Sequence, residues 1–299
     1  MKKQFIALAV TLAIASLANA QATDTIAKVK ASGAVTMGVR DSSGALSYTL
    51  GDGKYTGYHV EICQAILANL EKSIGKKVAI TYQPVTSQNR IPLVQNGTVD
   101  IECGSTTNNA TRQKDVAFAS TTFVEEVRIA VKANSGITTI AQLNGKNVAT
   151  TTGTTSVQTL RKNERATGVD FKEVYGKDHA ESFLLLESGR ADAFVMDGSI
   201  LAGNIANSKN PADFKIVGEV LSVEPIAIMM RKDDPAFKKL ADEAIAGLAK
   251  SGALAKLYDK WFMQAIPPKN TKVGLAASEG IKAAWATPND KPMEDYAKK

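Results

Sequence analysis

The hydrophobic and polar positions of the chain follow a strand–helix–strand order. Apolar runs at 35–39, 78–82 and 99–101 are short and bounded by polar turns, which is typical of buried strands. Between them, 58–70 carries apolar residues at helical spacing, and a shorter apolar helix at 91–94 stops at an Asn-Gly pair. Buried strands that alternate with helices predict a parallel α/β sheet.

This pattern recurs 92 residues further along the chain. The leucine, glycine and aspartate of 93–101 have the same spacing as those of 185–193. In each copy a helix ends at the glycine and a short strand follows, as a βαβ unit requires. Two similar α/β lobes are therefore predicted, and ligands of such sheets bind beyond the carboxyl ends of the strands. The same offset aligns Ser87 with His179 and Ser105 with Asp197.

Two candidate helix starts lie between the two copies of the repeat. A strand ending near Ala149 leads into the threonine-rich loop 150–156 and a helix from about Val157, a start suited to an anion. It is not a phosphate-binding P-loop, because no Gly-Lys-Ser/Thr stands at the required place. The spacing of 178–181 is that of a capping box, which predicts His179 in a first helical turn. His179 could equally be an ordinary surface histidine.

The last third of the chain continues the α/β pattern. A strand is predicted at 225–230 and a helix at about 235–250. A further helix carries an apolar and aromatic stripe, interpreted as core packing, before the Pro267-Pro268 pair and a polar tail. The stripe consists of Leu254, Leu257, Tyr258, Trp261 and Phe262.

The first 20 residues have the features of a secretory signal peptide. Lys2 and Lys3 precede an apolar run that is too short to span a membrane, and Ala18-Asn19-Ala20 is a small-x-small cleavage pattern. Cleavage after Ala20 would leave 279 residues and lower the formal net charge from +6 to +4, because both lysines are lost.

Composition indicates a globular protein of about two domains, with 44% hydrophobic residues in 299. The sequence pI is about 9.1, but the lysines are scattered among acids and form no basic run, so we expect no nucleic-acid partner. In an oxidising compartment Cys63 and Cys103 could form a disulfide, which the sequence does not determine. We favour Cys63 as a buried free thiol on the stripe of its helix.

The polar stretch 103–112 is the strongest candidate for chemistry. It follows the strand at 99–101, is rich in hydroxyls and amides, and ends at Arg112. Thr111 is a good helix N-cap, so Arg112 is predicted in the first turn of a helix. Backbone N–H groups, a helix dipole and a guanidinium would then converge on one carboxylate. A capped polar turn without a ligand is the alternative.

Several motifs resemble one protein family, the periplasmic solute-binding proteins of polar amino-acid ABC importers. The resemblance covers essentially the whole chain after residue 20. Motifs of the wider family stand at 57–58, 143–148, 153–154, 188–193 and 260–262. More specific are 86–92 (TSQNRIP), 102–109 (ECGSTTNN), 177–179 (KDH) and 266–270 (IPPKN), which are similar to the glutamate/aspartate-binding branch.

The resemblance implies a fold of two α/β lobes joined by two crossing strands, a type II periplasmic-binding-protein clamp that closes over its ligand. The expected divisions are a signal peptide at 1–20, lobe 1 at 21–130, lobe 2 at 131–222, and a second part of lobe 1 with a tail at 223–299. One departure is His59, where the wider family usually has an acid, and we interpret it as structural.

The resemblance also implies a ligand set. Arg112 would bind the α-carboxylate with help from Ser105, Thr107 and Thr155, and Asp197 would hold the α-ammonium group. The side-chain carboxylate would be surrounded by Arg40, Ser87, Arg90 and His179. Three arginines and one aspartate match the two negative charges and one positive charge of an acidic amino acid.

The expected function is capture of L-glutamate or L-aspartate and its delivery to the membrane permease of an ABC importer, by a periplasmic monomer without metal or cofactor. The sequence contains no nucleophile–base signature and no zinc-ligand spacing that would indicate an enzyme. The alternatives are a glutamine or other polar amino-acid binder, and a dehydratase-like enzyme on the same fold, with His179 and Asp197 as acid and base.

Overall fold

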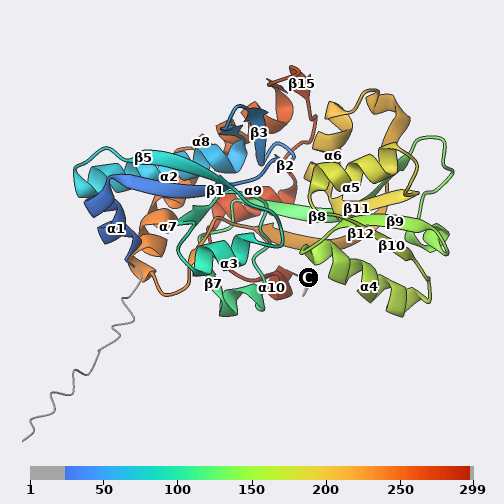
Figure 1. The fold of residues 1–299 in the computed structure, drawn as a ribbon, viewed down its shortest axis with the longest axis horizontal. Coiled ribbons are helices and arrows are strands. Elements are labelled where there is room, and N and C mark those ends of the chain that lie inside the picture. The colour runs from blue at the N-terminus through green and yellow to red at the C-terminus, as the bar shows by residue number, and fades with distance from the viewer. Residues whose placement is uncertain (1–23, 297–299) are drawn as a thin grey trace, which may run out of the picture.

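The fold consists of two lobes, each built on a five-stranded sheet, in a computed structural model that describes residues 24–296 (Figure 1). The predicted signal peptide lies outside the described residues. The strand orders are β5-β1-β6-β13-β7 in lobe 1 and β10-β9-β11-β8-β12 in lobe 2. In each sheet the first three strands are parallel and the fourth runs antiparallel to both neighbours. The predicted repeat is therefore a repeat of topology, and the two-lobed α/β class is confirmed.

Lobe 1 combines segments from both ends of the chain. Its strands are β1 (Ala34–Val39), β5 (Ala79–Pro84), β6 (Ile101–Glu102), β7 (Val116–Phe118) and β13 (Met229–Arg231). Its helices are α1 (Thr25–Ser32), α2 (Tyr58–Ile74), α3 (Arg90–Gln95), α7 (Pro235–Lys250) and α8 (Ala253–Tyr258), the last continued by a π-helical turn at Asp259–Met263. Short pairings add β2 (Ser42–Ser43), β3 (Ser47–Gly51), β4 (Lys54–Thr56), β14 (Ala265–Ile266) and β15 (Thr271–Lys272).

Lobe 2 is formed by the middle of the chain. Its strands are β8 (Phe123–Lys132), β9 (Asn147–Thr151), β10 (Lys172–Gly176), β11 (Ala193–Asp197) and β12 (Phe214–Ile226). Its helices are α4 (Thr155–Thr167), α5 (His179–Glu187) and α6 (Gly198–Asn207), with 3-10 turns at Ile140–Leu143 and Pro211–Asp213. α4 begins two residues before the predicted start.

Two long antiparallel strands join the lobes. β8 and β12 pair from Phe123–Ile226 to Lys132–Phe214, with a bulge between Val217 and Ser222. Where they enter lobe 1, Ile226 also pairs with Thr107. The C-terminal helices α9 (Glu279–Ala286) and α10 (Met293–Tyr296) belong to the segment that returns to this junction, where Trp285 Nε1 donates to the carbonyl of Thr122.

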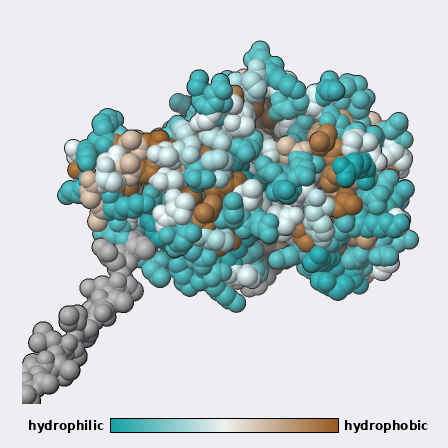
Figure 2. Space-filling model, viewed as in Figure 1, coloured by the Kyte–Doolittle hydropathy of each residue, from teal (hydrophilic) through white to brown (hydrophobic). Residues whose placement is uncertain are grey.

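Alternating side chains of the sheets form a core on each face. In lobe 2, Val127 and Ile129 pack on one face, whereas Ala130, Phe194 and Met196 pack on the other. In lobe 1 the predicted aromatic stripe is core packing, because Leu254, Tyr258, Trp261 and Phe262 are buried against α2 and the sheet. The face shown in Figure 2 is mostly hydrophilic, with small separate apolar patches. In the described part of the chain no helix is long and apolar enough to cross a membrane.

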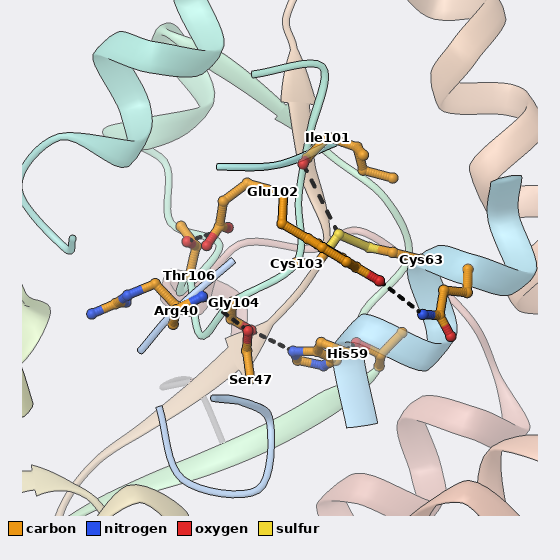
Figure 3. Close-up of a disulfide and its surroundings, with 12 residues drawn as sticks. Arg40, Ser47, His59, Cys63, Ile101, Glu102, Cys103, Gly104 and Thr106 are labelled. Carbon is orange, nitrogen blue, oxygen red and sulfur yellow. Dashed lines mark hydrogen bonds between the residues drawn. A yellow bond between two sulfur atoms is a disulfide. The ribbon is translucent and has the colours of Figure 1, made fainter. Parts of the chain in front are cut away.

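The two cysteines form a disulfide, so the expectation of a free thiol is wrong. Cys63 on α2 and Cys103 after β6 have Cα atoms 6.3 Å apart (Figure 3). One turn earlier on α2, buried His59 donates from Nδ1 to the carbonyl of Gly104 at 2.5 Å and accepts at Nε2 from the Thr122 hydroxyl at 2.8 Å. Burial lowers the pKa of His59 to about 4, so it is neutral and structural, as interpreted from the sequence. α2 thus anchors the polar stretch after β6 at two points.

Two predicted helix caps are not formed. Arg112 lies in a three-residue 3-10 turn, Arg112–Lys114, and the Thr111 side chain caps nothing because its backbone is already helical. Asn109 Oδ1 accepts from the Arg112 N–H instead, at 2.8 Å. The capping box at 178–181 is also wrong, since the Glu181 carboxylate accepts from Lys177 N and the Asp178 side chain turns to lobe 1.

Candidate ligand-binding site between the lobes

The nine polar side chains singled out in the sequence gather where the lobes face each other, and each is at most 9% exposed. They lie at strand ends or helix starts, because the carboxyl ends of parallel strands meet at one edge of a sheet. For example, Arg40 follows β1, Thr155 and His179 begin α4 and α5, and Asp197 ends β11. Lobe 1 contributes Arg40, Ser87, Arg90, Ser105, Thr107 and Arg112, and lobe 2 contributes Thr155, His179 and Asp197.

Arg40 is the centre of the contacts between the lobes. Its Nη2 donates to Ser87 Oγ at 3.0 Å within lobe 1, and to Asp178 Oδ1 at 2.8 Å in lobe 2. The same nitrogen lies 3.2 Å from His179 Nε2, and Nη1 lies 3.5 Å from Ser105 Oγ. The buried Nε of Arg40 has no partner in the described structure. One guanidinium therefore organises one side of the cleft.

His179 is neutral, and its contacts define its tautomer. Burial, followed by the positive charge of Arg40, lowers the pKa of His179 to about 3. Arginine can only donate, so Nε2 of His179 is the acceptor in the contact with Arg40. The hydrogen then lies on Nδ1, which donates to the Thr151 hydroxyl at 3.0 Å. His179 is in the first turn of α5, as predicted.

Asp178 is a cross-lobe contact that the sequence did not reveal. Besides the ion pair with Arg40, its Oδ2 accepts from the Ser42 hydroxyl at 2.8 Å, and Ser42 Oγ accepts from Ala180 N at 3.0 Å. Burial acts to raise the pKa of Asp178, but the charge of Arg40, the Ser42 hydroxyl and the backbone N–H of His179 hold it below its usual value. An aspartate before a helix resembles an ordinary N-cap, and the sequence predicts one here.

Arg90 is a buried cation with two unsatisfied nitrogens in the described part of the chain. Its side chain is 2% exposed, and Nε and Nη1 have no hydrogen-bond partner within residues 24–296. Burial, then the charges of Arg112 and Arg40, push its pKa well below the usual range. A buried unpaired guanidinium costs several kcal/mol of free energy, on the order of 3–5, unless an anion compensates it. This part of the cleft therefore favours an anionic group.

Arg112 and two threonines form the other side of the cleft. Arg112 Nη1 donates to the carbonyl of Thr107 at 2.9 Å, and Nη2 to the carbonyl of Gly153 in lobe 2 at 3.4 Å. The hydroxyl oxygens of Thr107 and Thr155 lie 3.3 Å apart across the lobes. An open pocket of about 640 Å³ beside Arg112 is lined by both lobes, which leaves a route to this side. The first N–H groups of α4, from Thr155, have no acceptor within the helix.

Buried carboxylates balance the arginines. Asp197 is 4% exposed, and burial together with nearby Glu125 and Glu224 pushes its pKa well above the usual range. Burial also raises the pKa of Glu125 to about 7, while its carboxylate accepts from the Ser199 hydroxyl and backbone N–H. Carboxylates that resist ionisation favour a cation nearby. Glu125 and Glu224 face each other in the β8–β12 ladder and were not singled out in the sequence.

The tight packing around Arg40 depends on a glycine. An added Cβ at Gly104 would lie 2.2 Å from Glu102 Oε1 and 2.8 Å from Arg40 Cγ, so a larger residue would displace the arginine. The disulfide and His59 hold this glycine from the other side (Figure 3). In sum, the cleft joins an arginine-rich region to an acid-rich one, which suits a small molecule with anionic and cationic groups.

Several known binding proteins are similar to this chain. The chain is 43% identical over 289 residues to the glutamate/aspartate import solute-binding protein of Escherichia coli, covering 96% of each chain. It is 44% identical over 275 residues to the L-glutamate/L-aspartate-binding protein of Pseudomonas aeruginosa, covering 91% of each. A solved structure of an ancestral arginine-binding protein bound to arginine matches with a TM-score of 0.68 and 30% identity, over 77% of this chain and 98% of that one. The model of the bacterial extracellular solute-binding proteins, family 3, matches residues 35–264, and the chain belongs to that family.

Proposed function

We propose that this protein captures L-glutamate or L-aspartate in the cleft between its lobes and delivers it to the permease of an ABC importer. Two relatives that are 43% and 44% identical over nine-tenths of the chain or more are named for these ligands, which supports the ligand class. The protein acts as a binding protein, not an enzyme. It works as a periplasmic monomer, after removal of residues 1–20, and needs neither cofactor nor nucleic acid. The lobe boundaries near Val131 and Val223 then lie within β8 and β12.

The observation that carries this proposal is the buried guanidinium of Arg90, whose Nε and Nη1 have no hydrogen-bond partner among the described residues. A side-chain carboxylate bound to Arg90 would also be attracted by the positive charge of Arg40. Its negative charge would offset the repulsion among Arg90, Arg112 and Arg40. In this proposal Arg40, Ser87, Arg90 and His179 surround the side-chain carboxylate. Arg112 binds the α-carboxylate with help from Ser105, Thr107 and Thr155. Asp197 receives the ammonium, whose charge offsets the carboxylates around it.

The test separates the two ends of the ligand by calorimetric titration of Arg40→Met, Arg90→Met and Arg112→Met with glutamate and with glutamine. Loss of Arg112 should weaken both ligands by about 2–5 kcal/mol, because both carry an α-carboxylate. Loss of Arg40 or Arg90 should weaken glutamate comparably and glutamine far less, since glutamine has no side-chain charge.

Arg231→Met is the matched control. Arg231 is also buried, but it pairs with Asp100 at 3.0 Å and with the Thr25 hydroxyl at 2.5 Å, away from the cleft. We expect this variant to lose stability and keep its affinity for glutamate. Equal losses for both ligands in Arg40→Met and Arg90→Met would refute the side-chain pocket. Tight binding of glutamine by the unmodified protein, without binding of either acid, would favour a glutamine-binding protein. Conversion of glutamate into a product, followed by NMR, would indicate an enzyme.

A further inference from the structure

Glu224, on the second strand that joins the lobes, holds a hydroxyl from each lobe. Its side chain is fully buried. Oε2 accepts hydrogen bonds from the hydroxyls of Thr107 in lobe 1 and Thr155 in lobe 2, each at 2.6 Å. The other oxygen, Oε1, accepts from the Ser222 hydroxyl at 2.9 Å. The short distances are those of charge-assisted hydrogen bonds to an ionised carboxylate.

These bonds determine how the two threonines can meet a ligand. A hydroxyl has a single hydrogen, and each threonine donates it to Glu224. The 3.3 Å contact between the two Oγ1 atoms therefore brings two acceptor oxygens side by side. Neither hydroxyl retains a hydrogen for a ligand carboxylate, whereas both retain lone pairs for a ligand N–H.

We propose that Glu224 is a positioning residue that makes the cleft select ligands with a primary ammonium group. This inference rests on the proposed function, and it assigns Thr107 and Thr155 to the ammonium group instead of the α-carboxylate. The Thr107 and Thr155 oxygens, together with the Asp197 carboxylate, offer three acceptors to the three hydrogens of an –NH3⁺ group. A diacid without an amine can still pair with the arginines, but it leaves these acceptor oxygens without a donor and close to one another. The binding free energy of such a diacid is therefore less favourable.

The α-carboxylate then needs donors other than the threonine hydroxyls. Arg112 is one, and the free N–H groups at the start of α4 are others. Glu224 also contributes to the electrostatics of Arg112, because its charge raises the pKa of Arg112 against the burial that lowers it. A role in charge balance alone would affect every anionic ligand alike. A changed preference for ligands that carry an amine therefore distinguishes a positioning role of Glu224 from a role in charge balance.

The test compares glutamate with glutarate, the same diacid without the ammonium group, on the wild-type protein and on Glu224→Gln. Affinity for glutamate is measured by calorimetry, and affinity for glutarate by displacement of bound glutamate. The amide of glutamine donates to one threonine oxygen, which frees that hydroxyl to donate to the ligand. We expect the preference for glutamate over glutarate to shrink by about tenfold or more.

Two further variants make the result specific. Glu102→Gln removes a buried carboxylate whose charge also acts on Arg112 but which accepts from Thr106, not from the two threonines, so its preference should stay within about threefold of the wild type. Thr155→Val removes one acceptor while keeping the shape of the side chain, and should weaken glutamate but not glutarate. This variant keeps the inference testable if Glu224→Gln does not fold.

The outcomes distinguish the inference from the proposed function. If the wild type binds neither glutamate nor aspartate, the proposed function is wrong. If the wild type binds glutamate but Glu224→Gln weakens glutamate and glutarate by the same factor, Glu224 only balances charge and the inference is wrong. An equal change of preference in Glu102→Gln would overturn it as well, because loss of any nearby carboxylate would then suffice.

Discussion

Replacing Gly153 with alanine is expected to keep the lobes from closing fully and so to weaken ligand binding. Gly153 lies in the threonine-rich loop before α4, in the left-handed region with φ +81°. An added Cβ would lie 2.8 Å from Gln88 Cα and 3.0 Å from the carbonyl carbon of Ser87, both backbone atoms of lobe 1. Ordinary contacts of a Cβ begin at 3.4 Å, and backbone cannot rotate away as a flexible side chain would. The lobes would have to separate instead.

Two costs contribute, and only one of them depends on the contact between the lobes. Alanine in the left-handed region costs about 1–2 kcal/mol wherever it stands. Overpacking a tight contact costs about 1–3 kcal/mol, and here this cost destabilises only the state in which the lobes are in contact. Because the arginines and hydroxyls of both lobes must meet one ligand, this second cost appears in the affinity. We expect glutamate to bind about 5- to 150-fold more weakly.

Gly168→Ala is the matched control. Gly168 ends α4 with φ +70°, and an added Cβ there meets nothing within 4 Å. Both variants should lose similar stability in thermal unfolding without ligand, but only Gly153→Ala should lose affinity in calorimetry. Small-angle scattering at saturating glutamate should give a larger radius of gyration for Gly153→Ala than for the wild type. The reasoning is refuted if Gly153→Ala binds as tightly as the wild type, or if Gly168→Ala loses as much affinity.

Two further predictions concern stability. The Cys63–Cys103 disulfide, with a sequence separation of 40, should contribute about 4 kcal/mol by restricting the unfolded chain, so the Cys63→Ala/Cys103→Ala double variant should melt lower than the oxidised protein and no longer respond to reductant. An unchanged melting temperature would show that the bond adds nothing. Burial raises the pKa of Glu125 to about 7 in the folded state. The contribution of Glu125 to the free energy of unfolding is therefore fully present at pH values below its pKa in the unfolded chain, and it is lost as the pH rises through 7. The melting temperature of Glu125→Gln relative to the wild type should therefore increase from about pH 5 to about pH 8, and a constant difference would contradict the raised pKa.

The sequence predicted the architecture because the architecture follows from local patterns. The buried strand predicted at 35–39 is β1 (Ala34–Val39), and the helix predicted at 58–70 is α2 (Tyr58–Ile74), since each carries one strong apolar period. The strand predicted at 78–82 is present as β5 (Ala79–Pro84), but it lies at the edge of the sheet and none of its residues is buried. The repeat at 93–101 and 185–193 located two equivalent strands, β6 and β11, within sheets of the same topology. The family and the two-lobed fold are confirmed. The roles of the nine site residues stay a prediction, although the structure brings their side chains into one cleft.

The errors all concern choices that tertiary contacts decide. Cys63 and Cys103 have no diagnostic spacing, and only the packing of α2 against the loop after β6 brings them together. Thr111 has a good capping side chain, but Asn109 is already placed to accept from Arg112 N. Asp178 has the sequence of a helix cap, yet a guanidinium across the cleft is a stronger partner for its carboxylate than a backbone N–H.

Glu224 shows why the rest of the site could not be found from sequence. It lies near the end of β12, directly before a proline. Burial does not alternate regularly along this strand, which also contains a bulge, so no sequence pattern marks Glu224 as a site residue. Its importance comes from two hydroxyls that are 117 and 69 residues away in sequence and belong to different lobes. A carboxylate in such a position acts on the ligand through the hydrogens of other residues, and no ligand-contact motif needs to contain it. Residues that orient the groups touching a ligand are therefore the part of a binding site that a three-dimensional structure reveals first.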